Sequence, residues 1–159
     1  MSGAFPAGMC GRTYTGGCFV TAGQFSTNCF GCNYLAPIAT SAAELQALKD
    51  FYSSTSGGSW SNSQSWLIGD PCISSWYGVT CNSAFAIVGL DLTNNNVVGP
   101  LPNSIGNLPY LTNLALGGNG ITGSIPLSVS SMSSLTYLTL SRNQLSGPVP
   151  SIPAGIIYL

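Results

Sequence analysis

The chain has 159 residues, of which 45% are hydrophobic and only 4% are charged, and its formal net charge is -1. No apolar run approaches the roughly 18 residues of a membrane-spanning helix, so we expect a soluble protein with no membrane span. The basic residues Arg12, Lys49 and Arg142 are scattered, which argues against nucleic acid as a partner. A surface with so little charge favours association with itself, with carbohydrate or with another neutral surface.

The first zone, residues 1–40, is a Gly- and Cys-rich stretch without clear periodicity. The chain has six cysteines and no histidine, which predicts three disulfides and an oxidising, extracellular location. Four of the cysteines lie here, with three pairings open, and we favour Cys18 with Cys29 and Cys10 with Cys32. We therefore expect a small disulfide-stapled extension. The first residues carry no signal-peptide pattern, so either a signal has been removed or the expected compartment is wrong.

The second zone, residues 41–86, opens with the signals of a helix. Ser41 and Glu44 have the spacing of a capping box. Apolar side chains then share one face of a short amphipathic helix: Leu45, Leu48, Phe51 and Tyr52. Gly57 and Gly58 end this helix. The loop-like segment that follows contains aromatic residues that we expect in the core: Trp60, Trp66, Trp76 and Tyr77.

The third zone, residues 87–159, repeats itself every 24 residues. Five columns share this step: Leu90, Leu114 and Leu138; Leu92, Leu116 and Leu140; Asn95, Asn119 and Asn143; Gly99, Gly123 and Gly147; Pro102, Pro126 and Pro150. Leucines two apart point to the same side of a strand and can stack on those of the next turn, each burial contributing roughly 1.5–3 kcal/mol. The asparagines can satisfy backbone groups where the chain turns inside the stack.

The repeats LDLTNNNVVGPLPNSIGNLPYL, LALGGNGITGSIPLSVSSMSSL and LTLSRNQLSGPVP resemble the plant-type leucine-rich repeat. The segment GDPCISSWYGVTC is similar to the disulfide-bonded N-terminal cap of that family, and the resemblance covers residues 41–159. It implies a right-handed α/β solenoid of short parallel strands and turns with a helix-containing cap. It also implies a disulfide between Cys72 and Cys81 and a role in extracellular recognition or as a scaffold.

The sequence offers no catalytic or cofactor-binding set. Gly118, Gly120 and Gly123 match the dinucleotide pattern GxGxxG, but no acidic residue follows Asp91 to bind a ribose. Without histidine, the usual nucleophile systems and a His-containing zinc site are excluded. The carboxylates are Glu44, Asp50, Asp70 and Asp91, and nothing places two of them face to face. We therefore expect a protein that is not an enzyme and has no cofactor or metal.

The outward-pointing strand positions define the candidate binding face. On the expected concave sheet these are Gly89, Asp91 and Thr93; Asn113, Ala115 and Gly117; and Tyr137, Thr139 and Ser141, with Arg142 beside them. We name Asp91, Asn113, Tyr137, Thr139 and Arg142 as its candidate contact residues. Aromatic and Arg anchors are typical of recognition surfaces, and this face carries few of them.

The last residues, SIPAGIIYL, align with NSIGNLPYL of the first turn, so the chain is expected to stop just before a fourth strand. This would leave an apolar, uncapped end that needs a cover. We expect that assembly end to consist of Leu138, Leu140, Leu145, Ile156 and Leu159. A second copy could supply the cover and build a head-to-tail filament, which the low charge favours.

Two other functions stay open. Further repeats of a longer ectodomain could cover the end, and that ectodomain would bind a protein or peptide ligand. The uncharged, Thr-bearing turns also suggest a glycan- or ice-surface binder, although a flat lattice binder would be expected to repeat one residue type along a column. No Asn-x-Ser/Thr site is present, whereas the Ser and Thr content is compatible with O-linked sugar.

Overall fold

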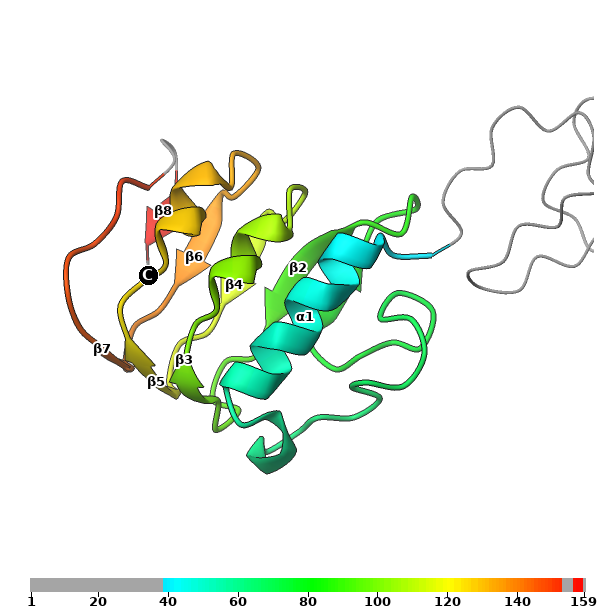
Figure 1. The fold of residues 1–159 in the computed structure, drawn as a ribbon, viewed down its shortest axis with the longest axis horizontal. Helices are drawn as coiled ribbons and strands as arrows, with labels where there is room; N and C mark the ends of the chain where they lie inside the picture. The colour runs from blue at the N-terminus through cyan, green and yellow to red at the C-terminus, as the bar shows by residue number, and fades with distance from the viewer. Residues whose placement is uncertain (1–38, 153–155, 159) are drawn as a thin grey trace, which may run out of the picture.

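A computed structural model describes residues 39–152 and 156–158, which form one short solenoid (Figure 1). A helix and two 3-10 helices lie side by side on one face, and a mostly parallel sheet lines the other. Cys10, Cys18, Cys29, Cys32 and Leu159 lie outside the described residues, so the predictions that involve them stay predictions. Within the described part, no helix is both long and apolar enough to cross a bilayer.

The cap begins with helix α1 (Ala42–Ser54), as its capping box predicts. The Glu44 N–H donates to Ser41 Oγ at 3.3 Å, and the Ser41 hydroxyl donates to Glu44 Oε2 at 2.7 Å. Glu44 has a second role: its Oε1 accepts the N–H of Ile87 at 3.0 Å. The Glu44 side chain is only 3% exposed, so this bond is buried. This carboxylate therefore ties the start of the helix to the start of the first repeat strand.

After η1 (Gly57–Ser59), the cap is built around three tryptophans. The rings of Trp60 and Trp66 lie 4.8 Å apart, and those of Trp66 and Trp76 lie 5.0 Å apart. Each indole N–H donates to a backbone carbonyl, so these polar groups are satisfied within the core. Tyr77 departs from the predicted core and is 39% exposed. The predicted disulfide joins Cys72 to Cys81, with 5.6 Å between their Cα atoms.

The main sheet has the strand order β1-β2-β4-β6-β8 and is called the concave sheet below. Its strands are β1 (Val79–Cys81), β2 (Ile87–Asp91), β4 (Asn113–Ala115), β6 (Tyr137–Thr139) and β8 (Ile157–Tyr158). Strand β1 of the cap is antiparallel to β2, and the other neighbours are parallel. Gly89, Asn113 and Tyr137 are consecutive partners, so the 24-residue step is the register of the sheet.

A second parallel sheet, with the order β3-β5-β7, was not predicted from the sequence. Its strands are β3 (Val98–Pro100), β5 (Gly120–Gly123) and β7 (Gln144–Leu145), and the 3-10 helices η2 (Asn103–Asn107) and η3 (Leu127–Ser131) follow the first two. Gly99 and Gly123 of the Gly column lie in this sheet, whereas Gly147 follows β7. At Gly99, where φ is 128°, a Cβ would collide with the Ser54 carbonyl at the end of α1, so the close approach of strand and helix requires glycine.

The leucine columns form the core, as predicted. Leu90, Leu92, Leu114, Leu116 and Leu138 are each at most 1% exposed and belong to one continuous cluster with the cap tryptophans. The cap and the repeats therefore share a single hydrophobic core, and neither can bury its apolar face without the other.

The asparagine column satisfies the backbone inside the solenoid, as predicted. Asn119 donates through Nδ2 to the carbonyls of Leu92 and Leu116 at 2.8 and 2.9 Å. Its Oδ1 accepts the N–H groups of Asn95 and Val97 at 2.9 and 3.0 Å. Each asparagine thus connects its own turn to the preceding one by hydrogen bonds. For Asn95, in the first turn, the partner is the cap, because its side chain bonds the backbone N–H and carbonyl of residue 62.

The last turn corrects the prediction that the chain stops before a fourth strand. Strand β8 pairs with β6, with Ile157 opposite Tyr137 and residue 158 opposite Leu138, a step of 20 residues instead of 24. Leu138 is only 1% exposed, so it does not belong to an open apolar end. Leu140, Leu145 and Ile156 are half-buried against the core.

Candidate functional site

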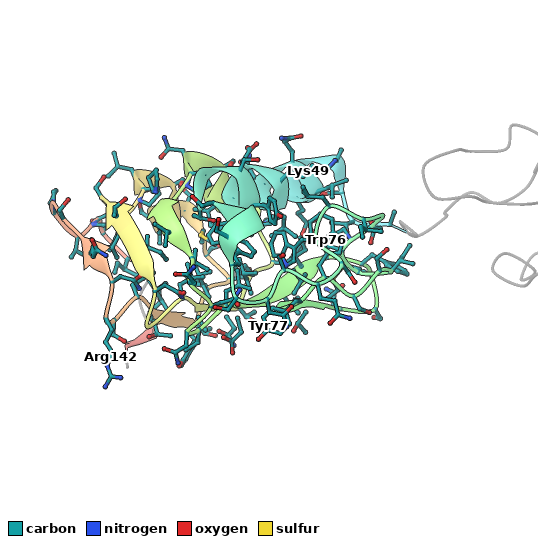
Figure 2. The ribbon with its side chains drawn as sticks, turned by 90° about the horizontal axis from the view of Figure 1, so that it is seen from below. Lys49, Trp76, Tyr77 and Arg142 are labelled. Atoms are coloured by element: carbon teal, nitrogen blue, oxygen red, sulfur yellow. A yellow bond between two sulfur atoms is a disulfide. The ribbon has the colours of Figure 1, made fainter. Side chains whose placement is uncertain are left out.

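The candidate site lies on the outer face of the concave sheet, opposite α1. Seen with α1 and Lys49 at the top, Tyr77 and Arg142 lie along the opposite edge of the molecule (Figure 2). Tyr137 and Thr139 are two residues apart on β6 and therefore share this face. Asp91 ends β2 and is exposed, while Asn113 begins β4 and is also exposed.

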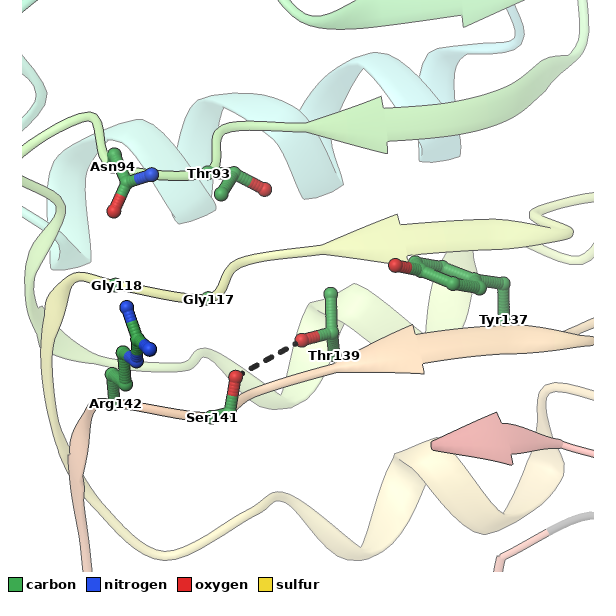
Figure 3. Close-up of a pocket in the computed structure, with 8 residues that line it drawn as sticks. All are labelled: Thr93, Asn94, Gly117, Gly118, Tyr137, Thr139, Ser141 and Arg142. Atoms are coloured by element: carbon green, nitrogen blue, oxygen red, sulfur yellow. Dashed lines mark hydrogen bonds between the residues drawn. The ribbon is translucent and has the colours of Figure 1, made fainter. Parts of the chain in front are cut away.

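A shallow open depression of about 270 Å³ marks the carboxyl ends of β4 and β6. Its lining consists of Thr93, Asn94, Gly117, Gly118, Tyr137, Thr139, Ser141 and Arg142. Three of the five predicted contact residues thus come together, and Asp91 and Asn113 lie on the same sheet outside this lining. Figure 3 shows Tyr137 and Arg142 at opposite ends of the depression, with two hydroxyl groups between them.

The floor of the depression is small and lined by hydroxyl groups. Thr139 Oγ1 and Ser141 Oγ are 3.4 Å apart (Figure 3). A Cβ on Gly117 would lie 3.2 Å from Thr139 Oγ1, so glycine keeps the space above these hydroxyls open. Thr139 is 8% exposed and Ala115 4%, so these two outward-facing strand positions are more buried than alternation along a strand predicts. Both lie in the middle of the sheet, where flanking strands cover short side chains.

One column of the repeat shapes the rim of the depression. Asn94, Gly118 and Arg142 are 24 residues apart, and all three have left-handed backbones, with φ of 53°, 69° and 55°. Asparagine and glycine accept this conformation readily, whereas for other residues it costs about 1–2 kcal/mol. The left-handed turn places the Arg142 side chain on the rim at the expense of backbone strain. Strain of this kind is typical of functional positions.

Asn94 and Gly118 line the depression, although the sequence did not place them on the binding face. A Cβ on Gly118 would collide with the Asn94 side chain, so the glycine lets that amide lie across the turn. The signal that could have found them is their place in the column of Arg142, one residue before each ladder asparagine. Tyr77 was also missed as a surface residue. It precedes Gly78, whose carbonyl accepts the Asp91 N–H at 2.8 Å, and so lies beside β2.

Hydrogen bonding, ring contact and one positive charge are what this face offers a ligand. Arg142 is exposed on the rim, and Asp91 is an exposed carboxylate whose Oδ1 accepts the Thr93 N–H at 3.0 Å. In residues 39–152 and 156–158, no three His, Cys, Asp or Glu side chains are grouped as they would be to hold a metal ion. The arrangement suits recognition of a polar, extended partner.

The fold and this face define a capped leucine-rich-repeat domain. Residues 41–82 match the family described as leucine rich repeat N-terminal domain, and residues 87–145 match the family described as leucine rich repeat. The described part of the chain therefore belongs to the plant-type leucine-rich-repeat proteins with an N-terminal cap. This class is extracellular or exposed at the cell surface.

A curated relative is a probable leucine-rich repeat receptor-like protein kinase of Arabidopsis thaliana, 40% identical over 72 residues. The match covers 45% of this chain and 7% of that protein, so the chain spans a small part of the relative's length.

Solved structures of plant ectodomains share the fold. The Arabidopsis receptor kinase HAESA, in complex with the peptide hormone IDA and the co-receptor SERK1, matches with a TM-score of 0.63 and 29% identity over 75% of this chain and 21% of that chain. A chain of the BIR3–SERK2 complex from Arabidopsis thaliana matches with a TM-score of 0.50 and 32% identity over 67% of this chain and 57% of that chain.

Proposed function

We propose that this domain is a non-catalytic ectodomain module that binds a protein or peptide segment on its concave sheet. The observation that carries the proposal is the depression in which Tyr137, the Thr139 and Ser141 hydroxyls and Arg142 converge at the ends of neighbouring strands. The kinship with HAESA, which was solved with a peptide hormone and a co-receptor, supports the same class of partner.

The dimensions of the depression set the size of the bound segment. It reaches across three turns of the solenoid, from Asn94 to Arg142. Neighbouring strands lie about 4.8 Å apart, so the three turns span roughly 10 Å, which matches about three residues of an extended peptide. The exposed ring of Tyr77 and the carboxylate of Asp91 continue the face toward the cap. A segment running from Tyr77 to Arg142 would therefore cross the concave sheet from the cap to β6.

Head-to-tail assembly, the function that the sequence favoured, stays a prediction. Burial of Leu138 removes one residue from the proposed assembly end, and Leu140, Leu145 and Ile156 are already half-buried. Binding to glycan or ice and O-glycosylation also stay predictions. The similarity to HAESA, which was solved with a peptide hormone and a co-receptor, favours a protein or peptide segment over these alternatives.

A display library of random 12-residue peptides, selected on the immobilised chain, tests the proposal. Enriched peptides would be titrated calorimetrically against the wild type, Gly117→Val and Arg142→Ala. Gly117→Val fills the depression, and Arg142→Ala removes its charge. We expect either change to weaken binding at least about tenfold, which is ~1.4 kcal/mol.

The matched control is Ala43→Leu, which adds side-chain volume to the exposed side of α1 on the opposite face. We expect this variant to bind like the wild type. Selected peptides that bind Gly117→Val and Arg142→Ala as tightly as the wild type would place the ligand elsewhere and refute the proposal.

A further inference from the structure

The N-terminal cap exposes an apolar patch away from the concave depression. It consists of Leu67, Ile68 and Ile73, which are 50%, 68% and 54% exposed, and is called the cap patch below. The patch lies on the loop between Trp66 and Trp76, whose buried rings are 5.0 Å apart. The Trp76 indole N–H donates to the Ile68 carbonyl at 2.9 Å, which fixes this part of the loop against the core. The apolar side chains are therefore displayed from a well-anchored backbone.

Leu67 combines a strained backbone with a half-exposed side chain. Its φ is 64°, a left-handed conformation that is a genuine outlier for a bulky residue. Glycine or asparagine would relieve this strain, and Gly69, two residues later, has the same conformation with φ of 61°. Large apolar side chains exposed together in this way are typical of a surface that contacts a partner.

The described chain starts beside this patch. Thr40 is only 7% exposed, and its N–H donates to Asp70 Oδ2 at 2.8 Å while its hydroxyl donates to Asp70 Oδ1 at 3.1 Å. Asp70 also accepts the N–H of Ile73 at 3.2 Å and follows Ile68 by two residues. The described part of the chain therefore begins at the edge of the patch.

We propose that residues 1–38 pack on the cap patch through their own apolar side chains. This segment has one charged residue, Arg12, and several large apolar ones: Phe5, Phe19, Phe25, Phe30, Tyr34 and Leu35. Chains of fewer than about 40 residues rarely bury enough apolar surface to fold alone, so a neighbouring apolar surface would complete their core. A few extended residues reach the patch from Thr40, since each spans about 3.3 Å.

Trypsin provides the test, because Arg12 is the sole Lys or Arg in residues 1–38. Cleavage after Arg12 would be followed by intact mass after reduction, in the full chain. The variant Ile68→Ser/Ile73→Ser removes most of the patch. Docking predicts that cleavage after Arg12 becomes about tenfold faster in this variant, because the open population of the segment increases.

The matched control is Leu127→Ser/Val149→Ser, which changes two residues that are 77% and 66% exposed in the later turns. Its cleavage rate after Arg12 should equal that of the wild type. Cleavage after the exposed Arg142 serves as an internal reference for general loosening of the fold and should be the same in all three proteins. Equal rates after Arg12 in Ile68→Ser/Ile73→Ser and the wild type would overturn the proposal.

A second measurement identifies the occupant directly in the wild-type chain. Nuclear Overhauser contacts are expected between the Ile68 or Ile73 methyl groups and aromatic rings of residues 1–38, at every protein concentration. Methyl groups without such contacts would overturn the proposal. Contacts that vanish on dilution, or that appear between labelled and unlabelled chains, would assign the patch to a second copy and refute packing within the chain.

Discussion

Replacement of Asn119 by alanine tests the asparagine ladder on which the concave sheet depends. The side chain accepts two N–H groups, from Asn95 and Val97, and donates to the Leu92 carbonyl among others. The variant leaves these three buried groups without a partner. Leu116 O keeps a bond from Asn143 at 2.9 Å and is spared.

Each orphaned buried group costs about 1–3 kcal/mol, and water entering the vacated space would offset part of the total. We therefore expect Asn119→Ala to lower the free energy of unfolding by about 3 kcal/mol. For a domain of this size, that loss corresponds to a fall in Tm of roughly 10 °C. Urea unfolding followed by tryptophan fluorescence and far-UV circular dichroism measures the effect at both the cap and the repeats.

The control is Asn113→Ala, which removes an exposed asparagine six residues earlier on the same turn. Surface changes of this kind usually stay within about 0.5 kcal/mol. If Asn119→Ala lost no more stability than Asn113→Ala, the ladder bonds would contribute little, and the account of the solenoid interior would be wrong.

Three further predictions follow from the same physical arguments. Arg142→Asn, which introduces the residue type of Asn94 in the same column, should raise the free energy of unfolding by about 1 kcal/mol because it relieves backbone strain. The same change should weaken ligand binding. Unchanged stability in urea unfolding would contradict the proposed strain. Glu44→Ala should lower the free energy of unfolding by about 2–3 kcal/mol. Glu44→Gln should lower it clearly less, since glutamine keeps an oxygen that can accept the Ile87 N–H. Equal losses of stability in the two variants would argue against that bond. Cys72→Ser/Cys81→Ser should cost about 2.5–3 kcal/mol by chain entropy, read from thermal melts of the variant and the oxidised wild type.

The repeat register could be predicted because it depends on buried columns that each turn must reproduce. Leu114 can stack only on a leucine in register, and Asn119 can bond the preceding turn only at one spacing. The capping box at Ser41 and Glu44 was equally readable, since it depends on local spacing. The leucine and asparagine columns make the same contacts in every turn, so the periodicity of the sequence reveals them.

The parts that could not be predicted depend on how turns and termini meet in space. The second sheet arises where β3 runs against the end of α1, a contact between residues 54 and 99 that no local pattern encodes. The last turn is four residues shorter than the others, so extrapolating the 24-residue step missed the pairing of β8 with β6. The burial of Thr139 depends on the residues of the neighbouring strands. The alternation of inward and outward side chains along a single strand does not predict it.

The rim of the depression contains both positions that the fold requires and a position that the fold does not explain. The column of Asn94, Gly118 and Arg142 is a requirement of the fold, because each turn passes there through a left-handed backbone. At the first two positions the residue type suits that conformation, and at the third an arginine occupies it at a cost in strain. Nothing in the buried ladder needs a guanidinium at this position, and the ligand contact proposed above would give a reason for the stability lost at Arg142. Apart from the exposed carboxylate of Asp91, the concave face is small and uncharged, so under that proposal its specificity would depend largely on Arg142.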